Sequence, residues 1–102
     1  MVDDSGMEVA LGGLNATLRD YAKFGLLYLN RGVWNSEQVV PADWVVASHA
    51  TDEDHLVPGD NPNSSSVWGY GYQWWVPGFP STEFTASGVY NQYIFIDPEN
   101  KV

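Results

Sequence analysis

The 102-residue sequence predicts a single α+β domain in which helices come before strands. Apolar residues recur at helical spacing between residues 18 and 29, and a shorter helix fits residues 42–50. The second half of the chain is instead rich in aromatic residues and interrupted by glycine and proline, which is typical of strands and turns. We therefore expect helices packed beside a small sheet.

The first helix has clear start and stop signals. Thr17 followed by Asp20 resembles a capping box, and Arg31-Gly32 predicts the end through a basic last turn and a left-handed glycine. The apolar stripe of this helix consists of Leu18, Tyr21, Ala22, Gly25, Leu26 and Leu29. Phe24 and Leu27 lie off the stripe, so we expect the helix to be buried on much of its circumference.

The chain between the two helices reads as an irregular connector with a small strand at residues 38–40. Pro41 suits the first position of the second helix, over residues 42–50. Residues 51–66 are polar, with prolines, a glycine and three consecutive serines, and predict a long surface loop.

Three strands are expected after this loop. The first is the aromatic segment 67–76, and the other two flank a break centred on Gly88, within Phe84–Pro98. Small residues at the end of a strand let a substrate approach the backbone closely, so this segment is typical of a binding edge. Asp97–Asn100 predicts a turn, after which Lys101-Val102 would begin another strand. We therefore expect the sequence to be a piece cut from a longer protein.

The composition excludes several classes of function. Thirteen acidic and four basic residues give a formal charge of −9, which disfavours nucleic acid and anionic lipid as partners. The absence of cysteine excludes disulfides and thiolate chemistry, and no apolar run is long enough to span a bilayer. His49, expected as a cation near a helix end, and His55, beside an acidic cluster, match no standard metal-ligand spacing. We expect no metal and no cofactor.

The aromatic segment allows two interpretations. Its tryptophans and tyrosines pack a core, or one face of the strand lines a cleft for a ligand. In an extended strand Tyr72, Trp74 and Val76 would share one face, and Gly71, Gln73 and Trp75 the other.

The common serine-nucleophile motifs are absent. The sequence contains neither Gly-x-Ser-x-Gly nor Ser-x-x-Lys. Tyr28-Leu29-Asn30 fits a Tyr-x-Asn pattern, but its place at the end of an apolar helix favours packing.

Four segments, in this order, carry a resemblance to a known family: GGLNATLRDYAKFG at 12–25, VPADWV at 40–45, GYGYQWW at 69–75 and GVYNQYIFIDP at 88–98. Together they resemble the C-terminal part of the serine β-lactamase and penicillin-binding-protein-like hydrolases. The likeness points to the class C-like branch that includes esterases and 6-aminohexanoate-oligomer hydrolases. It implies that residues 1–102 are the C-terminal portion of such a domain, with part of its antiparallel sheet and flanking helices.

The resemblance also implies roles for individual residues. Ala86-Ser87-Gly88 would take the place of the family's Lys-[Ser/Thr]-Gly motif on the strand beside the active site, with Ala86 replacing the cation. That loss favours a neutral ester or amide over a carboxylate-bearing β-lactam. The backbone N–H of Val89 would be the second oxyanion donor, which agrees with the physical requirement for a preorganised amide. Tyr90 and Gln92 would shape the substrate site.

The sequence thus predicts a fragment of a serine acyl hydrolase for ester, amide or lactam substrates, inactive without its nucleophile. The alternative is a small aromatic-rich ligand-binding module without catalysis. A fragment would also expose apolar surface on the first helix and on the strand containing Tyr93 and Ile94, so we expect self-association through an exposed sheet edge. The cellular compartment is not predicted.

Overall fold

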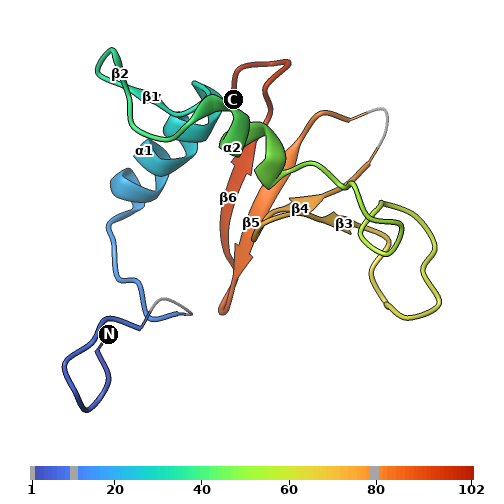
Figure 1. Ribbon diagram of the computed structural model, residues 1–102, viewed down its shortest axis with the longest axis horizontal. Helices are drawn as coiled ribbons and strands as arrows, with labels where there is room; N and C mark the ends of the chain where they lie inside the picture. The colour runs from blue at the N-terminus through green and yellow to red at the C-terminus, as the bar shows by residue number, and fades with distance from the viewer. Residues whose placement is uncertain (1, 10–11, 79–80) are drawn as a thin grey trace.

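The computed structural model describes residues 2–9, 12–78 and 81–102, and it has the predicted α+β fold (Figure 1). Two helices and a small hairpin precede a four-stranded antiparallel sheet with the strand order β3-β4-β5-β6. The bounds of the elements are α1 Leu18–Leu29, β1 Val33–Trp34, β2 Glu37–Gln38, α2 Ala42–Ser48, β3 Gly69–Tyr70, β4 Trp75–Val76, β5 Phe84–Gly88 and β6 Gln92–Ile96.

Helix α1 begins where the sequence predicts. The Thr17 hydroxyl accepts a hydrogen bond from the Asp20 N–H at 3.2 Å and donates one to the Asp20 carboxylate at 2.7 Å. The predicted end is correct at Gly32, whose φ is 83° and whose N–H donates to the Leu27 carbonyl. Arg31, however, lies beyond the last helical turn and also has a positive φ, of 53°. The prediction of a basic last turn is therefore wrong.

The connector before α2 is more regular than predicted. It is a hairpin in which Val33 pairs with Gln38 and Trp34 with Glu37, so the small strand predicted at residues 38–40 exists but spans Glu37–Gln38. Asn35 and Ser36 form its turn with φ values of 49° and 65°, the backbone required by a tight two-residue hairpin. Helix α2 is two residues shorter than expected, because it ends at Ser48.

The aromatic segment 67–76 is a hairpin, not one strand. Residues 71–74 turn the chain between β3 and β4, and the Gly71 N–H donates to the Trp74 carbonyl at 2.8 Å. The turn rests on the end of α2, since the Tyr72 N–H donates to the Ser48 carbonyl at 2.7 Å. The strict alternation of faces predicted for this segment therefore fails.

The β5–β6 hairpin has the predicted strands but a different break. Gly88 still pairs with Gln92 in the sheet, and the turn follows at residues 89–91. Tyr90 and Asn91, with φ values of 64° and 61°, form the turn that the sequence predicted to centre on Gly88. Residues 97–100 form the predicted turn, in which the Asp97 carboxylate accepts hydrogen bonds from Glu99 and Asn100.

Lys101 and Val102 form no strand among the described residues. Val102 does exchange two backbone hydrogen bonds with Asp97, at 2.6 and 3.1 Å, so the chain turns back beside the end of β6. The long loop over residues 51–66 is as predicted. Among the described residues, no helix has the length and apolar character needed to cross a membrane.

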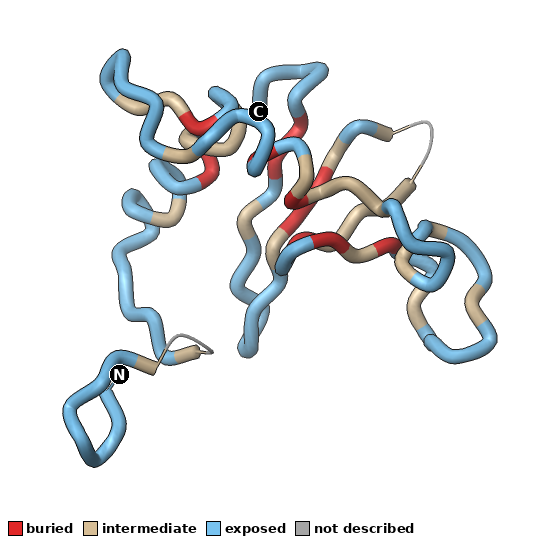
Figure 2. The backbone as a smooth tube through the Cα atoms, viewed as in Figure 1, coloured by how far each residue is buried: buried red, intermediate tan, exposed pale blue. Residues whose placement is uncertain are grey.

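The core lies where α1 meets the sheet. Trp74, Phe84 and Ile96 are buried, and the partly buried apolar residues around them are Tyr28, Leu29, Val76, Ala86 and Ile94. Figure 2 shows the buried segments confined to the helices, the sheet and the chain beside them, with the N-terminal segment mostly exposed. The helix itself is less covered than predicted: Gly25 is its only buried residue and the Leu18 side chain is 86% exposed.

Candidate functional site

The predicted site segment on β5 borders two hollows, whose linings share Trp75, Ser87, Gly88 and Tyr93. The first, which we call the α1-side cleft, has a volume of about 650 Å³. It is lined by Leu18, Tyr21, Tyr70, Gln73, Trp75, Ala86, Ser87, Gly88, Asn91, Gln92, Tyr93 and Ile94.

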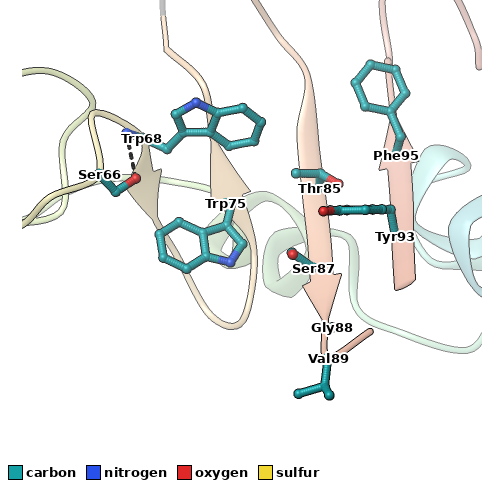
Figure 3. Close-up of a pocket in the computed structure, with 9 residues that line it drawn as sticks. All are labelled: Ser66, Trp68, Trp75, Thr85, Ser87, Gly88, Val89, Tyr93 and Phe95. Carbon is teal, nitrogen blue, oxygen red and sulfur yellow. Dashed lines mark hydrogen bonds between the residues drawn. The ribbon is translucent and has the colours of Figure 1, made fainter. Parts of the chain in front are cut away.

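The second hollow, the open-face hollow, has a volume of about 720 Å³ (Figure 3). It is lined by Ser66, Trp68, Trp75, Thr85, Ser87, Gly88, Val89, Tyr93 and Phe95. Thr85 pairs with Phe95 and Ser87 with Tyr93, so these four side chains share the face opposite to Phe84. Figure 3 shows the two tryptophans on one side of Ser87 and the phenyl rings of Tyr93 and Phe95 on the other.

The structure brings most of the predicted site residues together. Ala86, Ser87, Gly88 and Gln92 line the α1-side cleft, and Ser87 and Gly88 also border the open-face hollow. Tyr90 borders neither hollow, because it lies at the hairpin tip with 92% of its surface exposed.

Val89, the predicted oxyanion donor, is the first residue after β5 and borders the open-face hollow. Its side chain is 71% exposed. No backbone hydrogen bond recorded for residues 2–9, 12–78 and 81–102 uses its N–H. The amide is therefore free to meet a ligand, and its role as an oxyanion donor stays a prediction.

Both hollows are electrically neutral. The residues that line them include no aspartate, glutamate, lysine, arginine or histidine. Ser87 consequently has no base within either lining to activate its hydroxyl. The polar groups available for recognition are hydroxyls, side-chain amides and backbone.

The two histidines lie outside these hollows. His49 stacks on Phe84 with ring centroids 4.1 Å apart, and burial lowers the pKa of its imidazole below the ordinary value of 6.5. The expected cation at the helix end is thus disfavoured, because desolvation penalises the charged form. In the described part of the chain, no three histidine or carboxylate side chains gather into a group that could hold a metal ion.

Sequence reasoning missed several lining residues as members of a site. Gln73 and Asn91 both have left-handed backbone, with φ values of 71° and 61°. The position of Asn91 could have been predicted from the sequence, because asparagine tolerates the left-handed conformation in turns. The position of Gln73 could not, since glutamine has no such preference.

Comparison with known proteins decides the family. The family model described as Beta-lactamase matches residues 1–102. The chain belongs to the β-lactamase family. The resemblance carried by its four sequence segments is thereby confirmed.

Two relatives of this β-lactamase-family chain are both named 6-aminohexanoate-dimer hydrolase. The 6-aminohexanoate-dimer hydrolase of Paenarthrobacter ureafaciens is 31% identical over 98 residues, which are 95% of this chain and 25% of that protein. A solved structure from Bacillus anthracis, provisionally named a 6-aminohexanoate-dimer hydrolase, is 34% identical with a TM-score of 0.76. It is matched over 97% of this chain and 24% of its own. The chain therefore spans about a quarter of the length of these relatives.

Proposed function

We propose that this chain forms one wall of the substrate cleft of a serine acyl hydrolase, which cleaves an ester, amide or lactam through an acyl-enzyme. The observation that carries the proposal is the end of β5, where residues 86–89 border two uncharged hollows and present the free Val89 N–H. A backbone donor fixed at the end of a strand can stabilise negative charge without reorganising during the reaction.

The other predicted residues have supporting roles. Ala86 adds only a methyl group to the cleft lining, and the Gln92 side chain lies over Gly88 with its amide at the cleft. The neutral lining supports a neutral ester or amide as substrate, since a substrate carboxylate would find no cation here. Tyr90 would contact only a substrate that extends past the hairpin tip.

We further propose that residues 1–102 correspond to the C-terminal portion of the family's domain, and that the nucleophile comes from a segment outside them. The absence of Ser-x-x-Lys from the sequence and the quarter-length match to relatives support this assignment. On its own, the chain should not turn over substrate.

The test is labelling of the chain by a fluorophosphonate probe and by a fluorescent penicillin, read by intact-mass spectrometry. We expect no adduct and no hydrolysis of p-nitrophenyl esters above the rate seen with a Ser87→Ala variant. A covalent adduct on Ser87 would overturn the proposal, because it would make Ser87 the nucleophile.

A second candidate function rests on the open-face hollow. Trp68, Trp75 and Tyr93 present aromatic faces there, which suits stacking on a flat or sugar ligand without catalysis. Titration with oligosaccharides, followed by tryptophan fluorescence, distinguishes the two candidates. Saturable quenching would favour the binding module.

Self-association is a further part of the proposal. β6 is the last strand of the sheet, and an apolar groove of about 400 Å³ lies between it and α1. Leu26 from the helix, Tyr93 and Phe95 from the strand are exposed beside this groove. Unpaired backbone next to apolar side chains favours pairing with a second copy.

A further inference from the structure

We infer that Gln73 recognises the uncharged amide or ester group of a substrate in the α1-side cleft. This inference rests on the proposed function and names a specificity-determining residue for it. Gln73 comes from the β3–β4 turn, whereas Ser87 and Gly88 belong to β5, so the cleft has a polar group on each of two separate hairpins.

The backbone of Gln73 is held in an unfavourable conformation. Its φ of 71° lies in the left-handed region that glycine and asparagine occupy more readily. The conformation is imposed by neighbours: the Gly71 N–H donates to Trp74, the Gln73 N–H donates to Gly71, and the Tyr72 N–H donates to Ser48. A glycine at position 73 would satisfy the same turn without strain, so the turn itself does not require glutamine.

The side chain of Gln73 is available to a ligand. The residue is exposed, and no hydrogen bond recorded among the described residues involves its carboxamide. A carboxamide offers one acceptor and two donors, which match the N–H and C=O of an uncharged amide and the carbonyl of an ester. A strained position that presents an unused polar group to a cavity is a feature of functional sites.

The other amides of the cleft are less suited to this role. Asn91 already accepts a hydrogen bond from the Tyr93 hydroxyl at 3.4 Å. The Gln92 side chain packs over Gly88, with its carbonyl oxygen 3.4 Å from the place where a side chain on Gly88 would begin. Gln73 is therefore the amide that can face a substrate from the opposite hairpin, between the apolar walls formed by Trp75 and Ile94.

The experiment separates the stability of the fold from binding. The probe is 6-acetamidohexanamide, a neutral chain with two amide groups, titrated into the ¹⁵N-labelled 102-residue chain. We expect the Ser87 and Gly88 amide resonances to shift with saturation, because both residues line this cleft. Gln73→Gly should raise the Tm by a few degrees through relief of strain and weaken binding about threefold to tenfold, the value of one neutral hydrogen bond.

Two variants serve as comparisons. Ser36→Gly relieves the same kind of left-handed backbone strain in the β1–β2 turn, outside both hollows. It should raise the Tm and leave the affinity for the probe unchanged. Gln73→Asn keeps a carboxamide on a residue that tolerates this φ, and should bind the probe more tightly than Gln73→Gly.

The outcomes distinguish this inference from the proposed function. If the native chain binds the probe and both Gln73 variants bind it with the native affinity, the proposed role of Gln73 is wrong and the proposed cleft stands. If the native chain shows no shift at Ser87 or Gly88 up to high probe concentration, the proposed cleft itself is wrong, and the inference falls with it.

Discussion

Gly71 shows how a single residue without a side chain sets the position of the candidate site. A Cβ atom there would meet the carbonyl oxygen of Ser48, the acceptor of the Tyr72 N–H. This close approach seats the β3–β4 turn on the end of α2. The same turn carries Gln73 into the α1-side cleft, so the glycine is needed for the geometry of the cleft.

We predict that Gly71→Ala destabilises the fold by about 1–3 kcal/mol, the usual cost of forcing an extra methyl group into a packed region. Gly12→Ala is the matched control, because a Cβ at Gly12 would meet no atom within 4 Å. Urea unfolding followed by tryptophan fluorescence gives both values. Equal free energies of unfolding for the two variants would show that the approach to Ser48 is not tight.

His49 is the second informative residue, since burial against Phe84 lowers the pKa of its imidazole. Between that lowered pKa and the ordinary value near 6.5, the unfolded chain binds more protons than the folded chain. The contribution of neutral His49 to the free energy of unfolding is therefore complete above pH 6.5. It is lost as the pH falls from 6.5 through the lowered pKa of the folded chain.

We predict that the free energy of unfolding of the native chain decreases from pH 8 to pH 5, and that His49→Phe flattens this dependence while keeping the stacked ring. Thermal unfolding at several pH values measures both curves. Asp97 does not contribute to the change between pH 8 and pH 5. Hydrogen bonds from Asn100 lower the pKa of its carboxyl below 3.8, so its contribution to stability is lost only at more acidic pH. Parallel curves for the two proteins would contradict the assignment to His49.

At the scale of elements, the start of helix α1 was predicted correctly from the sequence. Its cap depends only on neighbours in the chain, because Thr17 and Asp20 bond to each other across one turn. Local signals of this kind can be read without knowing what the helix packs against.

Thr17→Ala should destabilise the fold by about 1 kcal/mol, because the Asp20 N–H and carboxylate both lose the Thr17 hydroxyl, and only the Thr17 carbonyl still accepts from that N–H. Thr17→Ser keeps the hydroxyl and should stay close to the native value. Circular dichroism during thermal unfolding measures the difference. A Thr17→Ser variant as unstable as Thr17→Ala would indicate that the methyl group, not the cap, matters.

The β3–β4 hairpin is the element that the sequence misrepresented. An unbroken aromatic segment predicts one strand, because aromatic residues favour strands in general. What breaks the strand is contact with α2, a helix that ends about twenty residues earlier in the chain. The same contact sends Trp74 into the core, where its ring lies 5.0 Å from Phe84, while Trp75 borders both hollows.

At the scale of the whole molecule, much apolar surface remains uncovered. Leu18, Tyr93 and Phe95 are exposed around the free side of β6 and the groove beside α1. An edge strand with apolar neighbours is prone to pair with another strand. The formal charge of −9 opposes this pairing, so salt should strengthen it.

We predict a concentration-dependent dimer in sedimentation velocity experiments. The dimer should be more populated at roughly 0.5 M salt than at roughly 0.05 M salt, concentrations above and below physiological ionic strength. Tyr93→Lys, which places a charge on the edge strand, should shift the equilibrium to monomer. Val39→Lys, at an exposed apolar position outside the sheet, is the control. A native chain that stays monomeric at every concentration would refute self-association.

The sequence by itself determined the α+β class, the start of α1, the β5 and β6 strands and the family to which the chain belongs. Each of these follows from local caps, from periodicity or from short segments read in order. Only the tertiary structure decided that Gln73 joins Ser87 and Gly88 in one cleft, that Tyr90 stays outside it, and that His49 is held toward its neutral form. Those outcomes depend on contacts between segments that are distant in the chain. No local sequence pattern shows that such segments approach closely or bury one another.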